Sequence, residues 1–452
     1  MSDDTIAAVA TGGGRAGIGV VRVSGPLAPT IARAVTAREL VPREATYLPF
    51  LDQTGTALDV GIAIGFTAPH SFTGEDVLEL QGHGGPIVLD LVLERVLSLG
   101  ARAARPGEFS ERAFLNDKLD LAQAEAVADL VESNSRAAAR AAVRSLSGAF
   151  SADVEAVVGE LDTLRAWLEA ALDFSDEDID FLADPELERR ADDLVARFDA
   201  LLARSEQGQR LRDGLTIVIA GIPNVGKSSL LNALAGTDSA IVTDVAGTTR
   251  DVLHERLVID GLPLHVIDTA GLRESEDPVE REGVRRARQA AATADHVLLV
   301  VDAREAALPP VLDVPTDVPW TLVLNKCDLV DTSGDDSGRA PSDGSGTTPL
   351  ATLSVSALTG AGLDTLRAHL QSLAGRDESV EGVYLARRRH LDALVEARDF
   401  AESALERLRT AELPELAAEE LRLARRALER ITGRYDTEDL LGRIFSDFCI
   451  GK

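Results

Sequence analysis

The first 118 residues alternate short apolar runs with glycine-rich turns. Apolar runs bounded by such breakers are typical of β-strands. Strands are expected at 5–10, 18–23 and 77–80, with a turn at Gly12-Gly13-Gly14 and a glycine-rich loop from Gln81 to Pro86 that leads into a helix over 87–99. Such loops can approach a ligand, but tight turns are their commoner use. The pattern predicts a mixed α/β domain over residues 1–118.

Helical spacing replaces this pattern in two later stretches. Residues 119–212 carry apolar side chains at helical intervals in long alanine-rich segments, interrupted by the acidic turn Ser175 to Asp178, and 387–431 resume the pattern. The simplest arrangement is one helical domain whose two parts, 119–212 and 376–452, pack together around a domain inserted at 213–375. Two sequential helical domains are the alternative.

The inserted segment contains a strand-to-helix turn with a recognisable spacing. The apolar run Leu215 to Ala220 precedes Gly221-Ile222-Pro223-Asn224-Val225-Gly226-Lys227-Ser228-Ser229, and a helical pattern begins at Leu230. A G-x-x-x-x-G-K-S turn directs backbone N–H groups toward phosphate at a helix N-terminus. Lys227 is expected to reach the β- and γ-phosphates, with Ser228 on Mg²⁺. The turn predicts a nucleoside triphosphate site.

Four further motifs indicate which nucleotide binds. Asp268-Thr269-Ala270-Gly271 ends an apolar run, which places Asp268 near Mg²⁺ and the Gly271 amide near the γ-phosphate. In Asn325-Lys326-Cys327-Asp328, the carboxylate can accept two N–H bonds from guanine, whereas adenine has no such pair of donors. Ser354-Val355-Ser356-Ala357-Leu358 is expected to close the base pocket, and Ala246-Gly247-Thr248-Thr249-Arg250-Asp251 to supply Thr249 as a second Mg²⁺ ligand. Five motifs in order predict a GTPase.

One residue of Ras-like GTPases is missing from this pattern. There a Gln after the D-x-x-G glycine orients the attacking water, whereas this chain has Leu272 at that position. Glu274 is the nearest candidate for the role, although a solvated surface carboxylate is the plainer interpretation. No arginine is an evident finger, and a monovalent cation beside the Asn224 side chain could replace the missing charge.

Composition narrows the class of protein. The net charge of −29 argues against a chain that wraps nucleic acid in a broad basic surface, so any RNA contact is expected to be local or shared with a partner. Two cysteines and seven scattered histidines exclude a disulfide framework and a four-ligand zinc site. No apolar run is long enough to cross a bilayer and the N-terminus lacks a signal-like region. A cytoplasmic protein without a membrane partner is expected.

Lysine usage points to individual positions. The chain contains four lysines, and arginine supplies the other 42 of its 46 basic residues. A compact ammonium is hard to replace by a planar guanidinium at some sites, so lysines kept in an arginine-rich chain suggest functional positions. Lys227 and Lys326 lie in the GTPase motifs. The same argument favours Lys118 and Lys452, with coincidence as the alternative.

Motifs outside the GTPase segment carry a family resemblance. They are Thr5-Ile6-Ala7, Gly17-Ile18-Gly19 with Arg22, Ser71-Phe72-Thr73-Gly74-Glu75-Asp76, Leu80-Gln81-Gly82-His83-Gly84-Gly85, Arg105-Pro106-Gly107-Glu108-Phe109-Ser110, Asn116-Asp117-Lys118-Leu119-Asp120 and Cys449-Ile450-Gly451-Lys452. With the GTPase motifs, this set resembles the MnmE (TrmE) family of bacterial tRNA-modifying GTPases over nearly the whole chain. The chain departs from the family pattern at two places: it has Gly12-Gly13 after Thr11, where the family has Pro, and an acidic loop at 331–348. Neither departure affects a residue with a chemical role.

The resemblance implies an α/β and all-α multidomain fold: an N-terminal α/β domain that binds tetrahydrofolate and dimerises, a helical domain, and an inserted P-loop GTPase domain. It implies a homodimer whose GTP hydrolysis depends on K⁺ and dimerisation. It also implies a FAD-containing partner, MnmG, in a heterotetramer or larger complex that contacts tRNA jointly. Together they would add a carboxymethylaminomethyl or aminomethyl group to carbon 5 of the wobble uridine, with 5,10-methylene- or 5-formyl-tetrahydrofolate as one-carbon donor.

The resemblance also implies roles for individual residues. Folate would contact Arg22, Glu79, Lys118 and Lys452; K⁺ would be held by Asn224, Thr243, Val245 and Thr248; and Glu274 would orient the water. The full GTP-binding set would be Asn224, Val225, Gly226, Lys227, Ser228, Ser229, Thr243, Asp244, Val245, Ala246, Gly247, Thr248, Thr249, Asp268, Thr269, Ala270, Gly271, Asn325, Lys326, Asp328, Ser356, Ala357 and Leu358.

Two other classes of protein fit parts of the chain. One is a ribosome-assembly GTPase that switches shape without modification chemistry, and the other is a folate enzyme fused to a GTPase. The N-terminal folate residues distinguish the first, because such a switch has no use for them. At the C-terminus, Phe445 and Phe448 are expected to anchor the chain. Cys449 could be a nucleophile, but nothing beside it in sequence would lower its pKa, so anchoring or no role is as good an interpretation.

Overall fold

The structure is a computed structural model, and the chain forms two compact units in it. One unit contains 1–131, 143–201 and 392–452, and the other contains 132–142 and 202–391. The structure describes residues 4–133, 135–173, 185–222, 224–235, 254–259, 262–268, 294–304, 318–330, 349–373, 382–410, 414–434, 438–446 and 448–451. Among the described helices, none combines the length and the apolar character that a membrane span requires.

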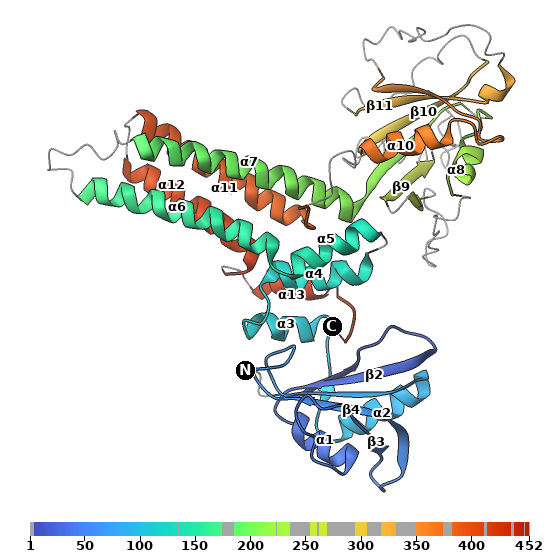
Figure 1. The fold of residues 1–452 in the computed structure, drawn as a ribbon, viewed down its shortest axis with the longest axis vertical. Coiled ribbons are helices and arrows are strands. Elements are labelled where there is room, and N and C mark those ends of the chain that lie inside the picture. The colour runs from blue at the N-terminus through green and yellow to red at the C-terminus, as the bar shows by residue number, and fades with distance from the viewer. Residues whose placement is uncertain are drawn as a thin grey trace, which may run out of the picture. The chain divides into compact units, whose positions relative to one another are not determined.

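The N-terminal part is a six-stranded sheet with helices on one face (Figure 1). Its elements are β1 (Ile6–Val9), β2 (Ala16–Ser24), α1 (Ala28–Thr36), β3 (Thr46–Leu51), β4 (Ala57–Phe66), β5 (Val77–Gly84), α2 (Pro86–Ser98) and β6 (Arg102–Ala103). The sheet order is β3-β4-β5-β2-β1-β6, with only the β1–β6 pair parallel. Val21 and Leu78 pack with Ile31 and Val92 in the core between sheet and helices. The α/β prediction is confirmed.

The prediction for one glycine-rich stretch of the N-terminal part was wrong. The stretch from Gln81 to Gly84 was expected to be a loop, but it belongs to β5. Here the glycines permit close approach between strands: a Cβ atom on Gly61 would lie 2.2 Å from the Gln81 carbonyl oxygen, and one on Gly82 would lie 2.2 Å from the Asp59 carboxylate. The prediction treated these glycines as breakers, and it also missed β3 and β4.

Helices form the rest of the first unit and extend to the second. They are α3 (Glu108–Leu115), α4 (Leu121–Glu132), α5 (Arg136–Leu146), α6 (Ala149–Asp173), α7 (Pro185–Asp213), α11 (Arg388–Thr410), α12 (Pro414–Thr432) and α13 (Glu438–Ser446). α12 lies along α6, with Arg425 and Asp162 3.0 Å apart, and α11 meets α7, with Arg398 and Asp199 3.1 Å apart. Segments before and after the GTPase motifs therefore pack together, as a single interrupted helical domain requires. The limits at 118, 212 and 375 stay predictions.

The GTPase segment builds a second sheet. It contains β7 (Leu215–Ala220), α8 (Lys227–Ala235), β8 (His254–Ile259), β9 (Leu262–Asp268), β10 (His296–Asp302), β11 (Trp320–Asn325), β12 (Ala351–Ser354) and α10 (Leu363–Leu373). The order is β12-β11-β10-β7-β9-β8, and only the β8–β9 pair is antiparallel. In such a sheet the carboxyl ends of the parallel strands gather at one edge, where ligands bind.

The chain enters and leaves this second sheet at neighbouring points. Gly208 of α7 lies against the backbone of Tyr384, because a Cβ atom on Gly208 would come 2.0 Å from the Tyr384 carbonyl oxygen. The Arg204 guanidinium lies 5.7 Å from the centre of the Tyr384 ring. The last turns of α7 and the segment that precedes α11 are thus in direct contact.

The C-terminus is anchored as expected. Phe445 and Phe448 are 2% and 4% exposed and pack with Leu121 of α4, and their rings lie 5.3 Å apart. Beyond them the Gly107 N–H donates to the Cys449 carbonyl at 3.4 Å. A Cβ atom on Gly451, whose φ is +94°, would lie 2.3 Å from the Val9 carbonyl oxygen. The terminal segment therefore reaches the N-terminal sheet; Lys452 itself lies outside the described residues.

Candidate functional site

The phosphate loop lies between β7 and α8 and is wound tightly. Gly221 has φ +153° and Gly226 has φ +94°, and a Cβ atom on Gly226 would lie 2.4 Å from Nδ2 of Asn325. Asn224 also has a positive φ, +69°. Positive φ costs a non-glycine residue free energy, and Asn tolerates it better than most. The loop therefore has a backbone conformation that favours glycine at positions 221 and 226.

Lys227 folds its side chain over this loop. Its side chain is buried, and Nζ donates to the Gly221 and Ile222 carbonyls at 2.8 and 3.2 Å. Neutral carbonyls are weaker acceptors for an ammonium than phosphate oxygens are. Ser228 and Ser229 follow in the first turn of α8, and both are exposed. The helix N-terminus, the lysine and the hydroxyls together suit a phosphate group.

Asn325 ties the phosphate loop to the base-recognition turns. It is 1% exposed; its Nδ2 donates to the Val225 carbonyl at 2.8 Å, and its Oδ1 accepts from the Ala357 N–H at 3.1 Å. Three motifs more than 30 residues apart therefore meet at one side chain. Ser356 is buried beside it, whereas Leu358 is 88% exposed. Asp328 is exposed in the 3-10 turn Cys327–Leu329.

Lys326 links the same two regions through its ammonium. Its Nζ donates to the Asn224 carbonyl at 2.8 Å and to Oδ2 of Asp302 at 2.9 Å. Asp302 ends β10 directly beside Asn325 and is buried. Hydrogen bonds from Arg304, and then from Lys326, hold the pKa of the Asp302 carboxyl well below its usual range. Asp302 therefore stays ionised and fixes the position of Lys326.

Asp302 was not singled out from the sequence. A signal was available, because an acidic residue at the carboxyl end of a parallel strand lies on the ligand side of the sheet. β9 likewise ends at Asp268, whose backbone lies opposite Ile219 of β7. The remaining predicted residues of this site lie outside the described residues: Thr243, Asp244, Val245, Ala246, Gly247, Thr248, Thr249, Thr269, Ala270, Gly271 and Glu274. In the described part of the chain no three His, Cys, Asp or Glu side chains cluster as metal ligands.

We expect Asn325→Ala to weaken the whole site. The substitution leaves the Val225 carbonyl and the Ala357 N–H without their partner, which costs about 1–3 kcal/mol for each buried group. Titration with a fluorescent GTP analogue should show affinity reduced by about tenfold or more. Asn116→Ala removes a similar bond, from Asn116 Nδ2 to the Thr73 carbonyl, in the N-terminal part. That control should leave GTP affinity unchanged, and equal losses in both variants would contradict the assigned role.

A second polar cluster lies on the sheet face opposite α1 and α2. Arg22 of β2 and Glu79 of β5 are register partners, and their Nη2 and Oε1 atoms are 2.9 Å apart. Gln81 Nε2 donates to the other Glu79 oxygen at 3.1 Å. The Arg22 guanidinium also lies 5.5 and 5.8 Å from the ring centres of Phe72 and Phe109. Two predicted folate residues are thus paired at a partly exposed position beside aromatic rings.

Lys118 borders the same region through the segment 69–74. Its Nζ donates to the Pro69 carbonyl at 3.1 Å, and a Cβ atom on Gly74 would lie 3.3 Å from its Cγ. Phe72, which contacts Arg22, belongs to this segment. Three predicted folate residues therefore line one side of the domain, and the fourth, Lys452, follows Gly451, which contacts Val9.

A network of buried ion pairs begins at Glu75, directly after the segment 69–74. Arg112 and Glu75 are 4% and 5% exposed and 3.0 Å apart, and Glu75 also accepts a bond from the Ser24 hydroxyl at 2.7 Å. Glu108 pairs with Arg102 and Arg112. Burial would raise the pKa of Glu108, but hydrogen bonds from Arg102 and from the Arg105 N–H outweigh it and lower the pKa to about 2.

We expect this network to make the N-terminal part sensitive to acid. Because the folded-state pKa of Glu108, about 2, lies below its ordinary value of 4.5, its stabilisation is present above pH 4.5 and is lost as the pH falls toward 2. In urea unfolding between pH 5.5 and 3, Glu108→Gln should show a smaller fall in stability than the parent protein. Glu186 has a similarly lowered pKa from the exposed Arg189. Glu186→Gln should change the pH profile little, since exposed ion pairs contribute little.

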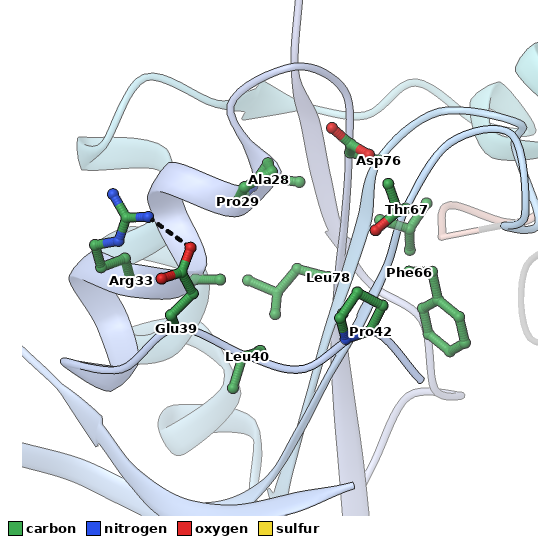
Figure 2. Close-up of a pocket in the computed structure, with 13 residues that line it drawn as sticks. Ala28, Pro29, Arg33, Glu39, Leu40, Pro42, Phe66, Thr67, Asp76 and Leu78 are labelled. Carbon is green, nitrogen blue, oxygen red and sulfur yellow. Dashed lines mark hydrogen bonds and ion pairs between the residues drawn. The ribbon is translucent and has the colours of Figure 1, made fainter. Parts of the chain in front are cut away.

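A cavity lies on the other face of the N-terminal sheet. It has a volume of about 280 Å³ between α1, the 39–42 segment and the first residues of β5. Figure 2 shows Leu40, Pro42, Phe66 and Leu78 around it, with the Arg33–Glu39 ion pair at its side. Successive strand residues face opposite ways, so Leu78 lines the cavity while Glu79 faces away from it. The cavity is separate from the predicted folate residues.

The phosphate loop after β7 and the N-K-C-D turn after β11, two parallel strands with β10 between them, are joined by the Asn325 side chain and define a P-loop GTP-binding protein. Family models agree: the MnmE helical domain matches 121–449 and the GTP-binding protein TrmE N-terminus matches 5–118. The chain belongs to the MnmE family of tRNA modification GTPases.

Two relatives show how close the family match is. The tRNA modification GTPase MnmE of Sodalis glossinidius is 54% identical over 458 residues, and that of Pseudomonas savastanoi is 56% identical over 459, each alignment covering 99% of both chains. Among solved structures, Aquifex aeolicus Era bound to GDP.AlF4- matches 41% of this chain and 66% of its own, with 24% identity and a TM-score of 0.26. That structural match is too low to support a conclusion about function.

Proposed function

We propose that this protein hydrolyses GTP as a step in the modification of tRNA wobble uridine. The observation that carries the proposal is the junction at Asn325, where the phosphate loop meets the guanine-recognition turns in a chain 54–56% identical to tRNA modification GTPases. The product would be a uridine with an aminomethyl-type group, aminomethyl or carboxymethylaminomethyl, on carbon 5.

In this proposal, different residues of the chain bind the phosphates, the base, the two metal ions and the attacking water. Lys227 exchanges its carbonyl partners for the β- and γ-phosphates, and Asp328 accepts the guanine N–H groups. Ser228, exposed at the start of α8, and Thr249 would hold Mg²⁺. Asn224, which is exposed and has a positive φ, would hold K⁺ with Thr243, Val245 and Thr248. Both ions would supply positive charge beside the phosphates, and Glu274 would orient the attacking water.

The N-terminal cluster is proposed to bind the one-carbon donor, 5,10-methylene- or 5-formyl-tetrahydrofolate. A folate carries carboxylates on its glutamate tail and polar groups on its pterin edge, so its site should pair cations with an acceptor. Arg22, Lys118 and Lys452 would be the cations and Glu79 the acceptor. The supporting observation is that Arg22 and Glu79 are paired beside Phe72, in the segment that Lys118 also contacts.

The proposal includes partners. Two copies would form a homodimer through the N-terminal domains, and a FAD-containing MnmG would join them and share the contact with tRNA. Neither follows from the contacts within one chain, and both rest on family membership.

GTP turnover should depend on K⁺ and on protein concentration, because the ion site at Asn224 would be complete only when two GTPase domains meet. Turnover is measured in KCl and in NaCl, and again over a dilution series. Equal rates in the two salts, or a rate per molecule that is constant on dilution, would contradict this part. Nucleoside analysis of tRNA from a deletion strain tests the modification, and a switch acting only in ribosome assembly would leave wobble uridine unchanged.

A further inference from the structure

Helix α5, labelled in Figure 1, contains three regularly spaced arginines. Arg136, Arg140 and Arg144 are four residues apart, so they lie on the same face of the helix. The first two are exposed and the third is partly exposed. The opposite face is buried, and it consists of Ala138, Ala141, Ala142 and Ser145. We call the three arginines the α5 stripe.

The charge of the α5 stripe is not neutralised locally. α5 contains no acidic residue, although the chain as a whole has 75 Asp and Glu against 46 Lys and Arg. Several other exposed arginines of the helical part have carboxylate partners, namely Glu186 for Arg189, Asp192 for Arg409 and Glu419 for Arg422. Within the described part of the chain, no carboxylate forms an ion pair with a stripe arginine.

The three arginines of the α5 stripe also destabilise the helix that carries them. Like charges four residues apart destabilise a helix by about 0.2–0.5 kcal/mol per pair. Arg136 is the first residue of α5, where the helix dipole disfavours a cation. Neither packing nor helix stability accounts for three arginines here, whereas binding to an anionic partner would.

We propose that the α5 stripe binds the phosphate backbone of tRNA. The inference rests on the proposed function, which makes tRNA the substrate. At a rise of 1.5 Å per residue, successive arginines are about 6 Å apart along the axis and the stripe spans about 12 Å. A nucleic-acid backbone presents a dense row of phosphates, and the planar guanidinium fork binds phosphate through two parallel hydrogen bonds.

The negative charge of the rest of the molecule restricts where on its surface RNA can bind. A chain of net charge −29 repels RNA over most of its surface, so an uncompensated basic face determines where the RNA approaches. Contacts to phosphate fix the position of a nucleic acid without reading its sequence. The α5 stripe would therefore position tRNA and leave the choice of tRNA to other contacts.

The test measures binding of a fluorescently labelled, unmodified tRNA transcript to the full chain by anisotropy over a range of low salt concentrations. In R136Q/R140Q/R144Q we expect affinity to fall by about tenfold or more, and the slope of log K against log salt to decrease by about 2, since each lost phosphate contact removes about 0.7–0.9. R136K/R140K/R144K keeps the charge and should keep most of the affinity and the slope.

A matched control changes the net charge equally elsewhere. R189Q/R409Q/R422Q removes three exposed arginines that have carboxylate partners, and it should bind tRNA within about twofold of the parent protein. The proposal is overturned if the stripe variant binds like the parent, if both triple variants lose affinity equally, or if the parent shows no salt-dependent binding. An α5 stripe that instead binds an acidic protein would leave tRNA affinity unchanged. GTP turnover of the same preparations reports on the proposed function separately.

Discussion

Replacing Asp328 with asparagine is expected to reverse the base preference of the GTPase site. The carboxylate accepts two N–H groups of guanine, and each hydrogen bond to a charged group contributes about 1.5–3 kcal/mol. The amide offers one acceptor and one donor, so GTP affinity should fall by about 100-fold or more. Xanthosine triphosphate carries a carbonyl where guanine has its amino group, so the asparagine variant should prefer it.

The structure indicates that this substitution should change base recognition without disturbing the fold. Asp328 is exposed in its turn, while Asn325 and Lys326 hold that turn against the phosphate loop. The fold should therefore survive, and competition titrations with both nucleotides measure the exchange. Asp364→Asn changes an exposed side chain on α10 of the same unit; it is the matched control and should leave both affinities unchanged. If the Asp328 variant keeps its GTP affinity, base recognition lies elsewhere.

Deleting Cys449 to Lys452 is expected to weaken folate binding and to abolish tRNA modification. The terminal residues follow the Phe445 and Phe448 anchor and pass Gly107 and Val9. Gly451 is thereby brought to the N-terminal sheet, and the deletion would remove the proposed cation that follows it in sequence, Lys452. GTP affinity should not change, because the nucleotide site belongs to the other unit.

Equilibrium dialysis with 5-formyl-tetrahydrofolate and nucleoside analysis of a complemented deletion strain provide the two measurements. Lys452→Ala should weaken folate binding, while Cys449→Ser should not, which separates loss of the charge from loss of the thiol. A truncated protein that binds folate like the parent and restores the modification would disprove the role of the terminus.

The sequence predicted the phosphate loop and the N-K-C-D turn because each motif determines its own backbone. Gly226 must be glycine where Asn325 approaches, and that requirement is visible as spacing. The position of Asp302 at the end of an apolar run was a visible signal, but its bond to Lys326 depends on the register between β10 and β11, which no local pattern shows. The bond that Arg112 donates to Glu75 joins residues 37 positions apart, and no local sequence pattern shows it either.

In the N-terminal part, the strand prediction was wrong where glycines allow close approach between strands instead of forming turns. Gly61 and Gly82 occur inside strands because a neighbouring carbonyl or carboxylate occupies the space of a side chain. From composition alone they look like turn residues. The pairing of Arg22 with Glu79, in contrast, follows once β2 and β5 are aligned, because the two residues are direct partners.

The contact between Gly208 and Tyr384 has a consequence for how this architecture could have arisen. A guest domain whose two ends meet can be added to or removed from a host helix pair without stretching either, because closing a short gap costs little chain entropy. The Asp199–Arg398 ion pair between α7 and α11 involves no residue of the guest, so removal of the guest would leave both partners in the host. The helical host and its nucleotide-binding guest could therefore have separate evolutionary histories, and a version closed by a short linker near 208 and 384 would still be a connected helical protein.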